Sequence, residues 1–497
     1  MREDSRPNEQ AKDKKEVGKK LMDEAEKKAD EPKKKAGAVR KADEAGKAGA
    51  VRKADEAGRT GGDKKKDKAK KKAERQERRA VRRHRRAWSF FKFLLKRFFI
   101  RKFNYSYDSL KDVEGPYLLL SNHNMELDPA LVGIAADKQL YFVASEHIMR
   151  KGLGTWFLRR YFNPIIHTKG KTGTKSVMAI IKKLKKGHNV CLFAEGNRSF
   201  NGLTGDILPS TGKLARAAGA SLVTFRIEGG FLTQPRFSTS IRKGQTYGHL
   251  VHVYKPEELK AMTDDEMNEA INRDLYEDAY AVQDEKKIAY KGKNLTLGIE
   301  STLFYCPSCR AFNTLHSTED EVRCDACGFT ASYDEYGYLN CSDGVTRNMR
   351  DWDIEQKAAF EEAYADGTLP AFADTVSVRS IDNDHKAGKQ YWIEITASRE
   401  GVRVLFLDEG KKNKRRLVIP VHEDDGSTSE MKITKQIPPE DLAGLAIYSR
   451  NSMNVILGEK NEQFDIKADT GFNALKYRYL YEAMQKDRNI KSEEPNQ

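Results

Sequence analysis

A histidine and an aspartate five positions apart are the first residues of this chain that could do chemistry together. His123 and Asp128 stand in the stretch SNHNMELDPA, shortly after three leucines. Five residues of a continuous helix turn by about 500°, so the two side chains would not share a face. The spacing predicts instead that His123 lies in the loop after a strand and that Asp128 caps a helix, with Pro129 at its first position. The carboxylate could then hold one imidazole nitrogen and leave the other as a general base. An ordinary capping aspartate beside an unrelated histidine would have the same spacing.

A second polar cluster follows further along the chain, in the stretch LFAEGNRSFNG. An apolar run ends in this stretch, and the polar residues Glu195, Gly196, Arg198 and Ser199 follow it. A guanidinium at the carboxyl end of a strand, beside a flexible glycine, can bind phosphate with two parallel hydrogen bonds. A surface Arg–Glu pair would have the same sequence, so this cluster alone does not decide between the two.

Alternating apolar and amphipathic stretches predict the elements that position both clusters. The predicted buried strands are 117–121, 141–145, 164–168, 190–195 and 222–229, and the predicted helices between them are 129–138, 176–187 and 212–220. Repeated strand–helix–strand units indicate an α/β domain with a mostly parallel sheet. Active sites in such sheets lie beyond the carboxyl ends of the strands, so we expect the two clusters to share one cleft.

Together and in this order, the clusters resemble the motifs of the glycerophospholipid acyltransferase family, over roughly residues 88–260. The histidine motif of the family is matched by Asn122, His123 and Asp128, and the acidic motif by Glu195, Gly196, Arg198 and Ser199. The resemblance implies transfer of a fatty acyl chain from acyl-CoA or acyl carrier protein to the free hydroxyl of a lysophospholipid. The first candidate acceptor is 1-acylglycerol-3-phosphate, which would yield phosphatidic acid.

The resemblance also implies a role for each matching residue. His123 would be the general base, and Asp128 would orient it and offset the imidazolium charge. The implied substrate-binding residues are Asn122, Lys169, Glu195, Gly196, Arg198 and Ser199. Lys169 stands where the family has an arginine, and lysine keeps the charge but loses the bidentate fork. Another acceptor, such as a lyso-aminolipid, therefore remains an alternative.

Four of the six cysteines have the spacing of a metal site. Cys306 and Cys309 form one C-x2-C pair, and Cys324 and Cys327 form a second pair 14 residues later. This pattern predicts a zinc ribbon in which four thiolates fill the coordination sphere, so the zinc would be structural. A dithiol redox pair is the alternative. We expect Cys191, inside a predicted strand, to be a buried thiol.

The net positive charge of the chain is confined to its N-terminal end. The whole chain has a formal net charge of +15, and residues 1–86 contain 32 Lys and Arg against 18 Asp and Glu. This tail has no aromatic residue and little apolar surface to offset the entropy of folding, so we expect it to be disordered or only transiently helical. An identical twelve-residue repeat at 35–46 and 47–58 indicates low complexity.

The stretch 88–103, WSFFKFLLKRFFIRKF, predicts an amphipathic helix rich in aromatic and basic residues. Beside a polybasic segment, such a helix is typical of one that lies in an anionic membrane surface. The alternative is a helix packed on the domain core. There is no secretory signal peptide and no apolar run of about 18 residues. We therefore expect a cytoplasmic protein that is peripheral on the inner face of the cell membrane.

These patterns divide the chain into five parts. They are a basic tail (1–86), an acyltransferase domain (87–300), a zinc ribbon (301–342), a helical connector (343–370) and a β-rich domain (371–497). The last part contains several short strands and one terminal helix, an order similar to that of pleckstrin-homology domains.

The alternative to an enzyme is a non-enzymatic protein that binds nucleic acid or membrane through its tail and zinc ribbon. The lack of stacking partners argues against a single-stranded nucleic acid, whereas non-specific phosphate contacts of the tail stay open. The tail has no aromatic side chains for base stacking. The remainder of the chain is almost neutral, with 57 of the 89 Lys and Arg and 56 of the 74 Asp and Glu.

Overall fold

The structure is a computed structural model. It describes residues 61–150, 153–167, 173–382, 386–407, 418–422, 428–432, 434–458, 462–468 and 471–493. The first 60 residues of the expected tail, with its repeat, and Lys169 lie outside the described residues.

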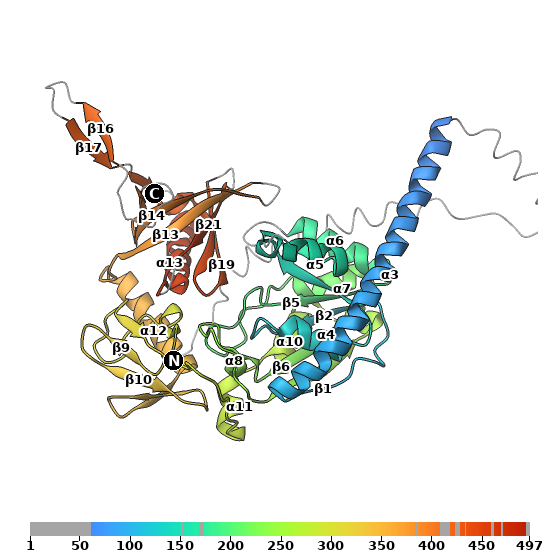
Figure 1. Cartoon of the computed structure of the whole chain (residues 1–497), viewed down its shortest axis with the longest axis horizontal. Helices are drawn as coiled ribbons and strands as arrows, with labels where there is room; N and C mark the ends of the chain where they lie inside the picture. Colours follow the sequence, from blue (N-terminus) through green and yellow to red (C-terminus); the bar gives the residue numbers. More distant parts are fainter. Residues whose placement is uncertain are drawn as a thin grey trace, which may run out of the picture.

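A seven-stranded sheet forms the centre of the first domain (Figure 1), with the strand order β1-β7-β6-β2-β5-β3-β4. All neighbouring strands are parallel except β6 and β7. The strands are β1 Tyr105–Tyr107, β2 Tyr117–Ser121, β3 Leu140–Ser145, β4 Ile165–His167, β5 Asn189–Phe193, β6 Ser221–Glu228 and β7 Thr246–Tyr254. The predicted α/β class with a mostly parallel sheet is confirmed.

The two edge-side strands β1 and β7 have no counterpart among the predicted strands. β1 has only three residues, and β7, TYGHLVHVY, contains a glycine and two histidines, so neither forms a continuous apolar run. Their pairing is parallel, and it ties the start of the domain to its end.

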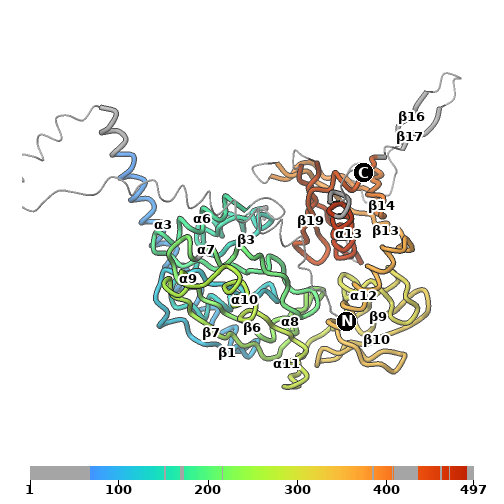
Figure 2. Tube along the Cα trace, turned by 180° about the vertical axis from the view of Figure 1, so that it is seen from behind, coloured from blue at the N-terminus to red at the C-terminus, as the bar shows by residue number. Residues whose placement is uncertain are grey.

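Helices cover both faces of the sheet (Figures 1 and 2). On one face, side chains of α6 Thr174–Lys185, α7 Thr211–Ala218, α9 Pro256–Ala261 and α10 Asp264–Leu275 share a core with alternate residues of β2, such as Leu118 and Leu120. On the other face, α3 Gly61–Phe103 and α4 Asp128–Ala135 pack around Leu119. Successive side chains of β2 therefore point alternately into two hydrophobic cores, as expected for a strand that is buried on both faces.

Helix α3 is 43 residues long and begins well before the predicted helix at Trp88. Residues 61–86, which we expected to be disordered or only transiently helical, form its first half, because lysine, arginine, glutamate and alanine all favour helix. Tertiary contacts support this half. The Arg83 side chain donates to the Arg160 carbonyl at 2.9 Å, and Glu77 pairs with Lys186.

The four-cysteine segment folds as an antiparallel sheet with the order β12-β11-β10-β9-β8. Its strands are β8 Leu315–Ser317, β9 Val322–Cys324, β10 Thr330–Tyr333, β11 Tyr338–Cys341 and β12 Thr346–Asn348. This sheet shares a core with α8 Gly230–Thr233 and α11 Ala279–Lys286 of the first domain. Helix α12 Met349–Ala365 follows it, within the expected connector.

The last part of the chain is a second seven-stranded sheet, antiparallel throughout, with the order β18-β15-β14-β13-β21-β20-β19. Its strands are β13 Phe372–Ile381, β14 Ala387–Ser398, β15 Gly401–Leu407, β18 Thr434–Ile437, β19 Leu442–Ser449, β20 Ser452–Leu457 and β21 Glu462–Lys467. A hairpin, β16 Val418–His422 and β17 Thr428–Lys432, lies between β15 and β18 in the sequence. The terminal helix α13 Ala474–Glu493 packs against the sheet, so the expected β-rich architecture is present.

Candidate active site

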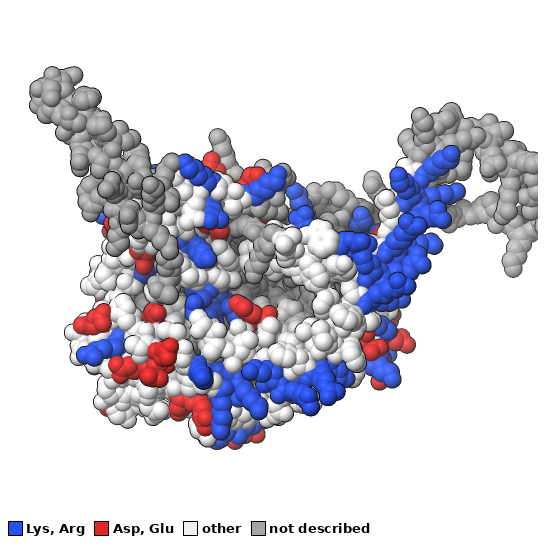
Figure 3. Space-filling model, viewed as in Figure 1, with Lys and Arg blue, Asp and Glu red and all other residues white. Residues whose placement is uncertain are grey.

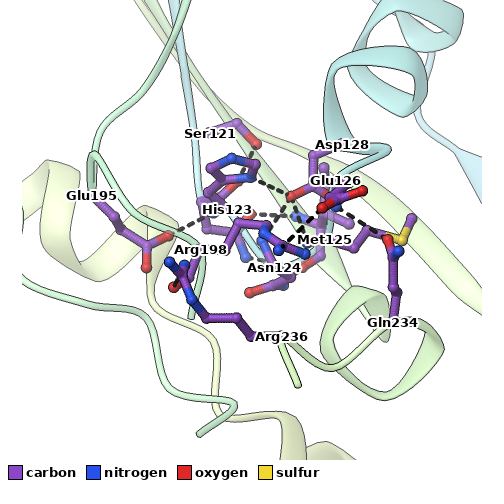
Figure 4. Close-up of polar contacts among 12 residues, drawn as sticks. Ser121, His123, Asn124, Met125, Glu126, Asp128, Glu195, Arg198, Gln234 and Arg236 are labelled. Atoms are coloured by element: carbon purple, nitrogen blue, oxygen red, sulfur yellow. Dashed lines mark hydrogen bonds and ion pairs between the residues drawn. The ribbon is translucent and has the colours of Figure 1, made fainter. Parts of the chain in front are cut away.

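His123 and Asp128 meet at the carboxyl end of β2 (Figure 4). The Nδ1 atom of His123 lies 2.8 Å from Oδ2 of Asp128, and the same oxygen accepts from the backbone N–H groups of Asn124 and Met125 at 2.7 and 2.9 Å. A carboxylate only accepts, so Nδ1 carries a proton, and in the neutral ring Nε2 then carries the lone pair. Asp128 is not the capping residue that we predicted. Helix α4 begins at Asp128, and Leu127 holds the capping position without a side-chain bond.

The imidazole ring and its loop are held from several sides. The His123 ring stacks on Phe193, the last residue of β5, with 4.4 Å between ring centroids. The backbone N–H of His123 donates to Oε1 of Glu195 at 2.6 Å, and the His123 carbonyl accepts from the Ser199 N–H at 2.8 Å. The two motif loops are thus bonded directly to each other, which confirms the expectation that the clusters meet.

The Glu195 side chain points towards backbone N–H groups and does not line the cavity beside His123. Its second oxygen accepts from the Gly205 N–H at 2.6 Å. Burial raises the pKa of the Glu195 carboxyl to about 8. The geometry makes Glu195 a residue that positions the His123 loop.

Asn122 likewise points into the domain. Its side chain accepts from the Ile227 N–H at 2.7 Å and donates to the Ile227 carbonyl at 2.9 Å. Its amide also donates to the carboxylate of Glu277, which accepts from Asn124 and from the Gly229 N–H as well. Burial raises the pKa of Glu277 to about 8. This network anchors both sides of the histidine loop, and the motif resemblance does not name Asn124 or Glu277.

Arg198 is the predicted substrate-binding residue that presents a charge next to the histidine. Its Nη2 donates to Oε1 of Glu126 at 3.3 Å, and its carbonyl accepts from Nη1 of Arg236 at 3.2 Å. Gly196 beside it has a φ of 69°, and an added Cβ would meet no atom within 4 Å. Ser199, by contrast, closes a turn, because its hydroxyl donates to the Leu203 carbonyl.

A cavity of about 580 Å³ connects these residues to an apolar region. Its polar end contains His123, Glu126, Gly196, Arg198 and Arg236. Its apolar end lies between α3, α4, β3 and α5 Leu153–Tyr161, and includes Trp88, Phe91, Leu95, Gly133, Phe142 and Leu158. The cavity therefore offers a base and a cation at one end and a hydrocarbon environment at the other.

The four cysteines of the second sheet lie together. Their Sγ atoms are all within 4.8 Å of one another, with 3.8 Å between Cys306 and Cys327 and 3.7 Å between Cys309 and Cys324. A tetrahedron with Zn–S bonds of about 2.3 Å has S···S edges of about 3.8 Å, so this donor set fits zinc. Cys191 is fully buried in β5, as expected, and burial raises the pKa of its thiol.

An α/β sheet with a partly buried His–Asp pair and an arginine at the carboxyl ends of its strands is an arrangement that could move a proton near a negatively charged group. The model of the acyltransferase family matches residues 101–228, which include both motif loops. Residues 101–228 are therefore similar to an acyltransferase domain, in agreement with the resemblance expected from the two motifs.

Comparison with solved structures finds similar chains for two parts of the protein. The 1-acyl-sn-glycerophosphate acyltransferase PlsC of Thermotoga maritima is 18% identical, with a TM-score of 0.34, and the match covers 40% of this chain and 79% of that chain. A human ARAP2 pleckstrin-homology domain is 9% identical, with a TM-score of 0.15 and coverage of 26% and 85%. The Ran-binding domain of NUP2 from Ashbya gossypii is 12% identical, with a TM-score of 0.14 and coverage of 24% and 98%. Comparison with curated proteins finds no match.

Proposed function

We propose that this protein transfers a fatty acyl chain from a thioester, acyl-CoA or acyl carrier protein, to the hydroxyl of a lysophospholipid, with 1-acylglycerol-3-phosphate as the preferred acceptor. The observation that carries this proposal is the His123–Asp128 pair, which faces the same cavity as Arg198. The family match supports acyl transfer as the reaction class.

In the proposed reaction, the acceptor hydroxyl attacks the thioester carbonyl carbon while Nε2 of His123 takes the hydroxyl proton. Asp128 holds Nδ1–H and stabilises the imidazolium that forms. When the tetrahedral intermediate collapses, the C–S bond breaks and the imidazolium returns the proton to the leaving thiolate. The products are the diacylated lipid and the free thiol, and no acyl-enzyme intermediate is needed.

Arg198 would bind the phosphate of the acceptor at the polar end of the cavity. Its side chain is buried, and Glu126, its ion-pair partner at 3.3 Å, is 63% exposed, so a phosphate could displace that carboxylate. Lys169 stays a proposed substrate-binding residue. Placement of the acceptor by these charges would supply the orientation that a two-substrate reaction requires.

The apolar end of the cavity would hold a fatty acyl chain, and α3 would bring that end to a membrane. One side of α3 is buried in the domain at Trp88 and Phe99, whereas the opposite side exposes Phe90, Phe93, Leu94, Phe98 and Ile100. Trp156 on the neighbouring α5 is 60% exposed. Lys and Arg side chains cover the preceding half of α3 (Figure 3). Exposed aromatic and basic residues on one helix favour the surface of an anionic bilayer.

The exposed apolar side of α3 supports a peripheral location. The cytoplasmic face of the membrane is part of our proposal and rests on the sequence alone. Within the described residues, no helix combines the length and apolar character that crossing a bilayer requires. The apolar end of the cavity and the exposed side of α3 share the same helix, so a lipid could pass from the membrane into the site without crossing water.

The four cysteines would hold a structural zinc. Four thiolates leave no open coordination position for substrate, so the metal would stabilise the small sheet and take no part in acyl transfer. Cys306 and Cys324 lie in the core that this sheet shares with the acyltransferase domain, so loss of zinc would disturb the contact between the two.

The experiment that tests the proposal is a thioester-release assay with a panel of lysophospholipids, using wild type, His123→Ala and a matched control, His252→Ala. The side chain of His252 is 48% exposed and pairs with Glu258, away from the cavity. We expect acceptor-dependent thiol release by wild type and His252→Ala, and none by folded His123→Ala. Equal release by both variants would overturn the proposed function.

A further inference from the structure

The C-terminal sheet domain forms part of the wall of the acyltransferase cavity. Ile447 and Tyr448, near the end of β19, line the same cavity as His123 and Arg198. Strand β19 is the part of that sheet nearest to the acyltransferase domain (Figures 1 and 2). Both residues lie more than 200 positions beyond the segment that matches the acyltransferase family, which ends at residue 228.

Buried polar contacts fix this domain in place. Glu146, which follows β3 and is 2% exposed, accepts from the side-chain amides of Asn454, at 3.3 Å, and Gln463. The ring of Tyr448 stacks on His147 with 4.7 Å between centroids. A buried carboxylate needs hydrogen-bond donors, and those of Glu146 come from the other domain, so the two surfaces are complementary at this contact.

Tyr448 lines the cavity beside His147, and its hydroxyl donates to Asp465 of the same domain. Two residues further along the chain, Nη1 of Arg450 donates to the Phe237 carbonyl at 3.3 Å. Phe237 directly follows Arg236, whose guanidinium lies against the Arg198 loop. The C-terminal domain therefore touches the segment that carries the second arginine of the polar end.

The polar end has more positive than negative charge. Arg236 is 4% exposed, and among the described residues its Nη2 atom has no hydrogen-bond partner. The ring of Phe200 lies 4.1 Å from the Arg236 guanidinium carbon and 5.8 Å from that of Arg478 on α13. Glu126 is the carboxylate paired with Arg198. Arg478 has its own carboxylate partner, Glu482. The described lining of the cavity places Arg198 and Arg236 against the single carboxylate of Glu126, and this balance of charge favours an anion such as phosphate.

We propose that Tyr448, contributed by the C-terminal domain, limits the size of the acceptor headgroup, so that the site takes a phosphate monoester and disfavours a phosphodiester. A phosphate with no further substituent can lie between Arg198 and the Tyr448 wall. A phosphodiester carries an added alcohol, such as glycerol, that would collide with this wall. The inference rests on the proposed acyl transfer and names the acceptor class of that site.

The test compares two acceptors with the same acyl chain, 1-acylglycerol-3-phosphate and 1-acylglycerophosphoglycerol. The ratio of their kcat/KM values is measured for wild type, Tyr448→Ala, Tyr448→Phe and Tyr336→Ala. Tyr336 is 39% exposed in the cysteine-bearing sheet and serves as the control. We expect wild type to favour the monoester at least tenfold. Tyr448→Ala should reduce this preference at least tenfold by raising kcat/KM for the diester. Tyr448→Phe and Tyr336→Ala should keep the wild-type ratio within twofold.

Two results would overturn the inference while leaving the proposed function intact. One is a wild type that uses both acceptors equally, and the other is a folded Tyr448→Ala with an unchanged ratio. If Tyr448→Ala does not fold, Tyr448→Leu, which keeps an apolar side chain, gives the same comparison. A wild type that transfers to neither acceptor overturns the proposed function, and the inference with it.

Discussion

The two ends of the cavity are built in different ways. At the polar end, backbone and side-chain hydrogen bonds fix nearly every group, and Asn122, Asn124 and Glu277 support the His123 loop from within the domain. The apolar end is lined by side chains of α3, α4 and α5, which pack mainly through van der Waals contacts, with hydrogen bonds such as that from Lys92 to the Ala136 carbonyl at the edge. In the proposed reaction, the polar end would determine whether acyl transfer occurs, and the apolar end would determine which acyl chains fit.

The largest expected effect is at the polar end, in Asp128→Asn. The amide would present a donor to Nδ1 or force the other tautomer, so Nε2 would no longer be the base. We expect kcat to fall about 1000-fold and KM to change little. Steady-state kinetics measure this, with circular dichroism as the check on folding. An unchanged kcat would show that the pair does not orient a base.

The next largest effect is expected for Arg198→Met, also at the polar end of the cavity. Loss of a charged hydrogen bond to phosphate costs about 1.5–3 kcal/mol, or roughly 10- to 100-fold in binding. We expect KM for a phosphate-bearing acceptor to rise by about that factor, with a smaller change for an uncharged monoacylglycerol. Arg216→Met is the matched control, because Arg216 pairs with Asp264 on the helical face away from the cavity. Equal effects of both variants would remove Arg198 from the acceptor site.

A smaller effect is expected at the apolar end, in Gly133→Leu. A Cβ at this position of α4 would lie 3.0 Å from the Trp88 ring, so a leucine side chain must occupy cavity space. We expect a shift of roughly tenfold in kcat/KM towards shorter acyl chains, because loss of space for about two methylenes costs about 1.5 kcal/mol. A donor series of increasing chain length measures this. Ala358→Leu, on the exposed side of α12, adds the same bulk outside the cavity.

The smallest effect is on stability, at Glu228, outside both ends of the cavity. A hydrogen bond from His249, followed by its charge and those of Lys286 and Arg226, lowers the pKa of Glu228 to about 2. Because this pKa lies below the ordinary value, the contribution to stability is present above about pH 4.5 and is lost as the pH falls towards 2. We expect Glu228→Gln to lose about 1 kcal/mol at neutral pH, since the group is half-buried and screened.

Chemical denaturation at a series of pH values measures the Glu228 contribution. The difference between wild type and Glu228→Gln should shrink as the pH drops below 4.5. Acyl transfer at neutral pH should be unchanged, because Glu228 does not line the cavity. A difference that is constant with pH would show that the carboxylate makes no ionic contribution.

The sequence predicts those parts of the fold and site that depend on local patterns. Strand β2 was predicted at its observed bounds, since its five residues form one continuous buried run. The meeting of the two motif clusters was predicted because both follow parallel strands of one sheet, whereas the bond of Glu195 to the His123 backbone was not. The inward orientation of Asn122 and Ser199 could not be predicted, because their partners, Ile227 and Leu203, belong to no motif.

Contacts between residues far apart in the chain could not be predicted from the sequence either. Glu277 supports the histidine loop from more than 150 positions away, and Tyr448 reaches the cavity from another domain. No periodicity or spacing connects such residues, since tertiary packing alone brings them together. The long helix α3 was underestimated for a related reason, because a segment without apolar periodicity can be helical when propensity and a few tertiary contacts support it.

The most direct test of the His123 assignment is chemical rescue. His123→Gly removes the imidazole and leaves space for imidazole added in solution, while Asp128 stays in place to orient it. We predict that His123→Gly releases no thiol with 1-acylglycerol-3-phosphate as acceptor, and that millimolar imidazole restores part of the wild-type rate in a saturable manner. Wild-type turnover by His123→Gly in the absence of imidazole would contradict the account.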